Sequence, residues 1–124
     1  MQITQDNAEG HQINAYDATH ITIDASDYQH SLIVSKNTII CPWTEKQFIE
    51  LTETDFAKLI ELKPHIVLLG TGLKQHYPSP TVMLLFHQHQ IGLECMSTAA
   101  ACRTYNVLAA EGRQVAAGLI LDKE

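Results

Sequence analysis

Two short segments carry the residue types from which a small polar site could be built. Gly70-Thr71-Gly72 follows one aliphatic run, and Glu94-Cys95-Met96-Ser97-Thr98 follows a second apolar stretch. In open α/β sheets, ligands collect beyond the carboxyl ends of parallel strands, where helix N-termini also direct free N–H groups. We therefore expect both segments to line one cleft suited to an anion or a carboxylate. Tight-turn geometry alone is the competing explanation for the glycines, since the chain has neither a Walker sequence nor GxGxxG.

Glu94 is the candidate acid or base of this cleft. Its strand is otherwise apolar, and a buried carboxylate without a partner is costly. Arg103 and Arg113, the only arginines, are the possible partners, and both a structural ion pair and a functional carboxylate are open explanations. Tyr105 and Asn106 could add hydrogen bonds from the helix that bears Arg103, although Tyr105 also fits the packing stripe of that helix. The candidate cleft residues are Gly70, Thr71, Gly72, Glu94, Met96, Thr98, Arg103, Tyr105 and Asn106.

Other catalytic chemistry has little support in the sequence. Cys95 and Cys102 lie near the start of a predicted helix, where a thiolate would be stabilised, but the sequence places no histidine beside either thiol. We expect all three cysteines to be reduced and structural. The seven histidines show no metal-ligand spacing, so we expect neither zinc nor any other cofactor.

The order of the predicted elements indicates an α/β domain. Period-two alternation from Ile13 to Trp43 predicts antiparallel strands arranged as a meander, with a turn at residues 24–27. After Leu51 the pattern alternates between helices and buried strands, which favours parallel strands with right-handed crossovers. The predicted helices begin after Thr52, Ser79 and Ser97 or Thr98, and the predicted strands cover 66–69, 91–95 and 115–121.

Composition excludes several classes of protein. The chain has 124 residues, the size of one domain, and we expect a single domain with residues 1–10 loose. Its net charge of −6 disfavours nucleic-acid binding. Lys36 is the first basic residue, so we expect no export signal, and no apolar run is long enough to cross a bilayer. These features favour the cytoplasm.

Four stretches of the sequence resemble a known family: LLGTG at 68–72, GLECMST at 92–98, AACRTYNVL at 100–108 and EGRQVAA at 111–117. The chain is similar to a family of unknown function that includes the mitochondrial respiratory complex I assembly factor 3 and an adipogenesis-associated cytosolic protein. The resemblance implies a three-layer α/β domain with a central mixed sheet and an additional N-terminal antiparallel β layer. It also implies a role with protein partners, as in the mitochondrial relatives.

Two classes of function follow from these observations. The first is a non-catalytic assembly or binding module that recognises a protein or a small anionic ligand through the cleft. The second is a small enzyme that uses Glu94 as acid or base on an anionic substrate held by Gly70-Thr71-Gly72. We favour the first class, because the chain shows no nucleophile–base pair, metal set or cofactor sequence.

Overall fold

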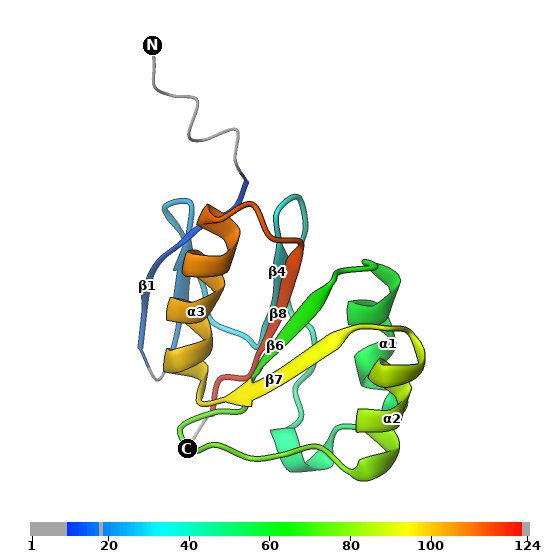
Figure 1. Ribbon diagram of the computed structural model, residues 1–124. Coiled ribbons are helices and arrows are strands. Elements are labelled where there is room, and N and C mark those ends of the chain that lie inside the picture. The colour runs from blue at the N-terminus through cyan, green and yellow to red at the C-terminus, as the bar shows by residue number, and fades with distance from the viewer. Residues whose placement is uncertain (1–9, 18, 123–124) are drawn as a thin grey trace.

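A five-stranded mixed sheet forms the centre of the molecule (Figure 1). The computed structural model describes residues 10–17 and 19–122, so the expected loose segment 1–10 lies almost wholly outside the described residues. The order of the strands in this sheet is β5-β4-β8-β6-β7. Strand β6 runs parallel to β7 and β8, whereas β4 runs antiparallel to β8 and β5. The strands are β4 (Leu32–Ser35), β5 (Ile39–Ile40), β6 (Ile66–Gly70), β7 (Gly92–Met96) and β8 (Val115–Leu119).

Helices cover both faces of this sheet. On one face lie α1 (Glu53–Glu61), α2 (Pro80–Gln88) and the 3₁₀ turn η2 (Phe48–Glu50). Helix α3 (Thr98–Ala110) packs on the other face, against β6 and β8. The expected helix starts are confirmed, since Thr52, Ser79 and Ser97 are the N-caps of α1, α2 and α3.

The N-terminal strands form a separate small sheet beside α3. Strands β1 (Ile13–Tyr16), β2 (Ile21–Ile23) and β3 (Ser26–Tyr28) pair antiparallel in that order. Their buried isoleucines share one core with α3 and the central sheet. The expected three-layer α/β architecture with an extra β layer is therefore confirmed.

The prediction of one continuous antiparallel meander through Trp43 is wrong. Strands β4 and β5 belong to the central sheet and do not pair with β3. The predicted turn at 24–27 is also shorter than expected. Only Asp24 and Ala25 have positive φ, of 52° and 72°, as a two-residue hairpin turn requires, and Ser26 and Asp27 belong to β3.

Trp43 packs directly against the middle of the central sheet. Its ring reaches Gly118 of β8, where an added Cβ would lie 2.9 Å from two ring carbons and 3.1 Å from Leu59 Cδ1. The indole Nε1 donates a hydrogen bond of 2.8 Å to the carbonyl of Asp55 at the start of α1. Gly118 therefore leaves the space in which this ring joins the sheet to α1.

Within the described residues, no helix is long and apolar enough to span a bilayer. The same part of the chain holds no cluster of three or more His, Cys, Asp or Glu side chains that could bind a metal ion.

Candidate functional site

The two predicted cleft segments meet at the carboxyl edge of the central sheet. The Thr71 amide donates to the Met96 carbonyl at 2.9 Å. The Gly72 amide donates to the Thr98 hydroxyl at 2.9 Å, and the Thr98 amide returns a hydrogen bond of 2.9 Å to the Gly72 carbonyl. The strands therefore bring Gly70-Thr71-Gly72 beside Met96 and Thr98, as expected of loops that follow neighbouring parallel strands.

The threonine hydroxyls of this junction are already hydrogen-bonded within the protein. Thr71 is 1% exposed, and its hydroxyl donates to the Lys74 carbonyl at 2.6 Å and accepts from the His76 amide at 3.0 Å. The Thr98 hydroxyl donates to the Ile120 carbonyl at 2.6 Å. The Thr98 bond holds this junction against the end of β8, whereas the Thr71 bonds close its own loop. Both hydroxyls are therefore already used within the fold.

The hollow beside this junction has an acidic lining. It encloses about 190 Å³, and its only charged lining residues among those described are Asp17 and Asp122. Asp122 Oδ2 accepts from the Leu73 amide at 2.8 Å. Two carboxylates disfavour the anionic ligand that the sequence suggested for this edge.

Glu94 is exposed, so the expectation that it is buried is wrong. The reason is the order of the strands. β7 is the last strand of the sheet, and part of it is exposed to solvent. Among the described residues Glu94 forms no ion pair, and the Arg103 guanidinium instead donates to the Tyr16 hydroxyl at 2.9 Å. The other candidate partner, Arg113, lies 3.9 Å from Glu111.

Three candidate site residues on α3 hold the N-terminal sheet in place. Besides the contact from Arg103, the Tyr105 hydroxyl donates to the His11 carbonyl at 3.0 Å. Asn106 accepts from the Ile13 amide at 2.9 Å and donates to the Ile13 carbonyl at 2.7 Å. The side chains in the most distinctive part of the sequence, residues 100–108, thus join α3 to β1 and the residues flanking it.

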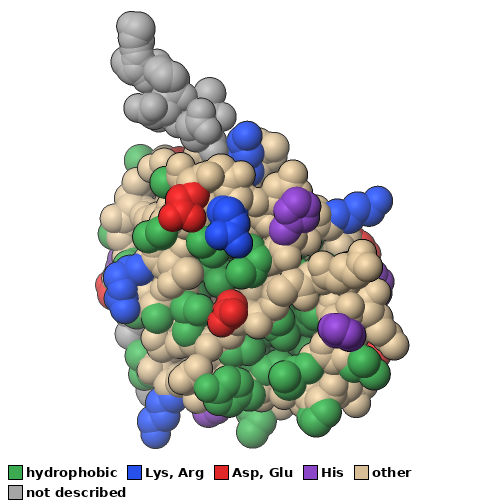
Figure 2. Space-filling view, viewed as in Figure 1, with side chains coloured by type: hydrophobic (Ala, Val, Ile, Leu, Met, Phe, Trp, Pro, Cys, Tyr) green, Lys and Arg blue, Asp and Glu red, His purple; other side chains and the backbone are tan. Residues whose placement is uncertain are grey.

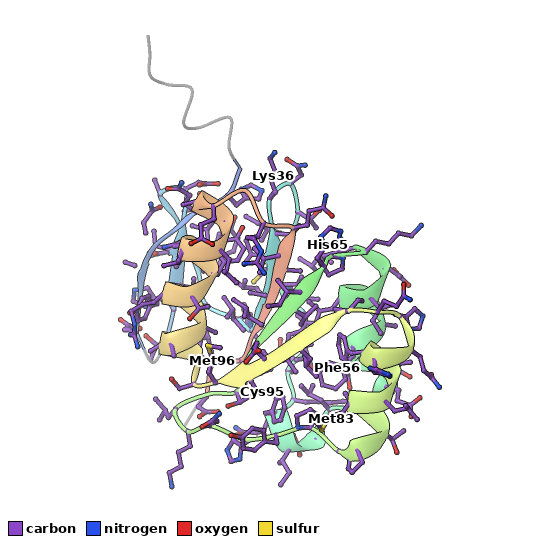
Figure 3. All side chains as sticks on the ribbon, in the orientation of Figure 1. Lys36, Phe56, His65, Met83, Cys95 and Met96 are labelled. Atoms are coloured by element: carbon purple, nitrogen blue, oxygen red, sulfur yellow. The ribbon has the colours of Figure 1, made fainter. Side chains whose placement is uncertain are left out.

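An open groove, here called the α2–β7 groove, lies between α2 and β7. It encloses about 750 Å³. Three large apolar side chains on its rim are exposed: Tyr77 at 69%, Met83 at 50% and Leu84 at 53%. Apolar side chains gather over this part of the molecule in Figure 2, and Figure 3 labels Met83 and Cys95 in the same region. The other lining residues are Gln75, Pro78, Pro80, Phe86, His87, Ile91, Gly92, Leu93, Glu94 and Cys95.

Sequence reasoning missed this groove although α2 carries a signal for it. The buried stripe of α2 consists of Val82 and Phe86, with Leu85 partly buried. Met83 and Leu84 are apolar but lie off that stripe. Large apolar residues on the polar side of an amphipathic helix indicate a second contact surface.

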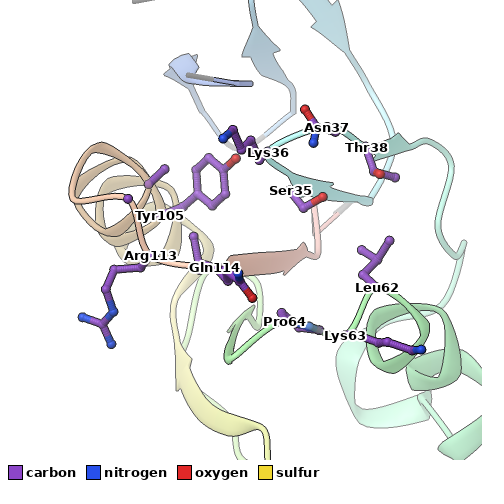
Figure 4. A pocket seen from close by; sticks show the side chains of 13 residues that line it. Ser35, Lys36, Asn37, Thr38, Leu62, Lys63, Pro64, Tyr105, Arg113 and Gln114 are labelled. Atoms are coloured by element: carbon purple, nitrogen blue, oxygen red, sulfur yellow. The ribbon is translucent and has the colours of Figure 1, made fainter. Parts of the chain in front are cut away.

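A second hollow of about 390 Å³ lies by the amino ends of β6 and β8, at the end of these strands away from the Thr71 and Thr98 junction (Figure 4). Three cations, Lys36, Lys63 and Arg113, border it. In Figure 4 the Lys63 and Arg113 side chains extend away from one another and from the middle of the hollow. The charges of Lys63 and Arg113 therefore do not converge on one point, as the binding of a small anion by both would require.

The cysteines have the properties of structural residues. All three are free thiols. Burial raises the pKa of Cys95 to about 11, with nearby Glu94 adding to the shift. Burial also raises the pKa of Cys102 to about 12, against a small opposing effect of Arg103. Both thiols are therefore protonated and poor nucleophiles near neutral pH.

Comparison with known proteins shows the family to which the chain belongs. The model of a protein family of unknown function, DUF498/DUF598, matches residues 13–120. The chain belongs to this family. The fold of this DUF498 chain is also that of solved proteins. A crystal structure from Bordetella parapertussis has a TM-score of 0.84 at 29% identity, covering 90% of this chain and 96% of that one. An NMR structure from Xanthomonas campestris has a TM-score of 0.81 at 34% identity, covering 98% and 92%.

Curated relatives of this DUF498 chain carry two kinds of name. The mouse NADH dehydrogenase [ubiquinone] 1 alpha subcomplex assembly factor 3 is 31% identical over 110 residues, which are 87% of this chain and 59% of that protein. A 13 kDa major membrane protein of Francisella tularensis is 28% identical over 102 residues, which are 79% and 80% of the two chains. The chain thus spans less than two thirds of the mouse assembly factor.

Proposed function

We propose that this domain is a non-catalytic protein-binding module of the assembly-factor kind, and that the α2–β7 groove is where it binds. One observation carries the proposal: Tyr77, Met83 and Leu84 are each at least half exposed around a single open groove. Of the six large apolar side chains that are exposed in the described part of the chain, these three line one groove, and burying them together against a partner would be favourable. Contiguous exposed apolar side chains rimmed by polar ones are typical of protein-interaction sites.

The named relatives support a protein partner. Assembly factor 3 of the mouse is named for the assembly of an NADH dehydrogenase subcomplex, and this chain matches 59% of it. A module that helps an assembly form needs contacts with other proteins more than it needs a catalytic centre. We place its action in a reducing compartment such as the cytoplasm, a choice supported by three free cysteines.

The alternatives use the carboxyl edge of the sheet and have less support. A small anionic ligand there would meet Asp17 and Asp122. An enzyme using Glu94 on a substrate held by Gly70-Thr71-Gly72 would need the Thr71 hydroxyl, which is buried and already engaged. Neither alternative explains the exposed side chains of the α2–β7 groove.

Site-specific photo-crosslinking tests the proposed function. A photoreactive amino acid replaces Leu84 in one variant and Val107 in a matched control, since Val107 of α3 is 56% exposed but lies outside the groove. In extracts of the source cells we expect a defined protein adduct from position 84 and not from position 107. The adduct supports the proposal only if the captured protein, once purified, binds this chain saturably. The Leu84→Lys variant of this chain should bind it at least tenfold more weakly, and the Val107→Lys variant should bind it as tightly as the wild type. Equal labelling from both positions, or none from position 84, would contradict it.

A further inference from the structure

We propose that the partner is held as an added β-strand. An extended segment of the partner pairs with the free edge of β7, directs apolar side chains into the α2–β7 groove and places a basic side chain opposite Glu94. This inference rests on the proposed function and specifies the chemistry of the partner. Three features of β7 support it: outer backbone groups that no described residue pairs with, an apolar face and a negative charge.

Most backbone groups on the outer edge of β7 have no partner among the described residues. Among the described strands, β7 is terminal in its sheet and pairs only with β6. The Gly92 amide donates to the His65 carbonyl, and the Met96 carbonyl accepts from the Thr71 amide, both at 2.9 Å. Because backbone groups alternate in direction along a strand, Gly92, Glu94 and Met96 face β6, and Leu93 and Cys95 face outward.

One of the outward groups is already engaged. The Gln75 side chain donates from Nε2 to the Cys95 carbonyl at 2.9 Å. The amide and carbonyl of Leu93 and the amide of Cys95 are then available to a new strand. A donor and an acceptor on one residue are what a hydrogen-bonded pair in an antiparallel ladder requires.

The two faces of β7 differ in chemistry. Leu93 and Cys95 pack against the same core as Val82 and Phe86, which places their side chains on the α2 face. On that face the groove extends the apolar surface outward to Tyr77, Met83 and Leu84. Alternate side chains of an added strand would therefore enter an apolar environment, a recurring way in which peptides bind sheet edges.

The remaining side chains of the added strand would lie on the α3 face, where Glu94 is. Glu94 is in register with Leu68, whose side chain packs in the core beneath α3. Glu94 is exposed and has no cation bound to it among the described residues. A Lys or Arg directly across the new ladder would pair with it, and opposite charges at such positions are favourable.

The same carboxylate disfavours a second copy of this chain as the occupant. The two-fold register that pairs all five residues of β7 with those of another copy would set Glu94 against Glu94. Like charges directly opposite one another are unfavourable, and each copy carries a net charge of −6. The charge pattern therefore favours a partner segment in which apolar and basic residues alternate.

Selection from a display library of short random peptides tests this inference, with the full chain as bait. We expect enrichment of apolar residues at every second position and of Lys or Arg between them. Glu94→Gln should lower the affinity of the best peptide about two- to fivefold. Glu61→Gln, which removes an exposed carboxylate of α1, is the matched control and should leave the affinity unchanged.

Amide hydrogen exchange on the chain, read by NMR, gives the decisive measurement. Binding of the selected peptide should slow exchange at Leu93 and Cys95, whereas Glu94 and Met96 are already protected by β6. Methylation of the peptide nitrogens that face the edge should weaken binding at least tenfold. Peptides enriched with helical spacing or acidic residues, or no enrichment, would overturn the inference. Binding that shifts the Met83 methyl signal without protecting Leu93 and Cys95 would overturn it too.

The failures of the two proposals can be told apart. If Leu84 crosslinks a partner but no added strand forms, the protein-binding function stands and only the added strand is wrong. If Leu84 captures no partner, the proposed function fails whatever the peptides do. Concentration-dependent protection of Leu93 and Cys95 without peptide would identify a second copy as the occupant and overturn the basic-segment inference.

Discussion

Asn106 binds the backbone of Ile13 through both ends of its carboxamide. Its Oδ1 accepts from the Ile13 amide at 2.9 Å, and its Nδ2 donates to the Ile13 carbonyl at 2.7 Å. A side chain of α3 thus occupies the place that a neighbouring strand would take beside β1. This contact spans 93 positions of the chain and attaches the N-terminal sheet to the main body of the molecule.

Asn106→Ala should therefore destabilise the whole domain. The change leaves a backbone donor and a backbone acceptor at Ile13 unpaired in a partly buried position, which costs about 1–3 kcal/mol. Urea unfolding followed by circular dichroism measures this loss. Asn37→Ala, at an exposed asparagine, is the control and should change the free energy of unfolding by less than about 0.5 kcal/mol. Equal stability of the two variants would show that the carboxamide contact is not needed.

Gly72→Ala should be more destabilising than Gly112→Ala. Both glycines have positive φ, of 104° and 80°, so each substitution carries a backbone penalty of about 1 kcal/mol. At Gly112 a Cβ has open space, but at Gly72 it would collide with the Asp122 carboxylate and disturb its bond to the Leu73 amide. We expect an additional loss of about 1–2 kcal/mol at Gly72. Thermal unfolding of the two variants side by side is the measurement, and a larger loss at Gly112 would contradict the collision.

Stability should fall in alkaline solution because Cys102 is buried as a neutral thiol. Burial raises the pKa of its folded form to about 12, above the ordinary value of 9.0. Above pH 9 the unfolded chain loses this proton while the folded chain keeps it, so ionisation favours unfolding. The contribution is intact below pH 9 and is lost progressively as the pH rises towards 12. For this one group the loss is about 2 kcal/mol at about pH 10.5.

Cys102→Ala is the variant that isolates this effect. Its stability at neutral pH will differ from that of the wild type, but its decline between about pH 8 and 10.5 should be shallower. Urea unfolding at each pH provides the comparison. Parallel declines in the two proteins would mean that the Cys102 thiol does not control alkaline stability.

Glu94→Gln should leave the free energy of unfolding within about 0.5 kcal/mol of the wild type. Glu94 is exposed and forms no ion pair among the described residues, so removing its charge leaves no buried cation behind. Chemical unfolding in buffer checks this expectation. A loss of more than about 1 kcal/mol would instead indicate a structural pairing of the kind first considered with Arg103.

Local features of the fold could be predicted from sequence, and the position of Glu94 could not. Ser79 before Pro80, and Ser97 before the third helix, are capping signals that depend on residues a few positions away. Whether an apolar run is a central or an edge strand depends on the order of strands in space. Ile66–Gly70 lies between two strands, but Gly92–Met96 lies at the edge, and only there can a carboxylate remain in water.

The candidate site was predicted only in part, because some of its contacts depend on nearby residues and others on distant ones. Short connections after parallel strands were enough to bring Thr71 beside Met96. The partners of Arg103 and Asn106, however, are Tyr16 and Ile13, which belong to the far end of the sequence. Long-range pairs of this kind follow from the packing of α3 against the N-terminal sheet, and spacing along the chain carries no signal of them.

The contact between Trp43 and Gly118 has a consequence for how this fold can change in evolution. The indole ring fills the space that a Cβ at position 118 would need, since that atom would lie 2.9 Å from the ring. A mutation to alanine in β8 would therefore be accepted only after, or together with, a smaller residue at position 43. In an alignment of homologues, positions 43 and 118 should covary. A bulky aromatic residue should stand at position 43 wherever position 118 is glycine.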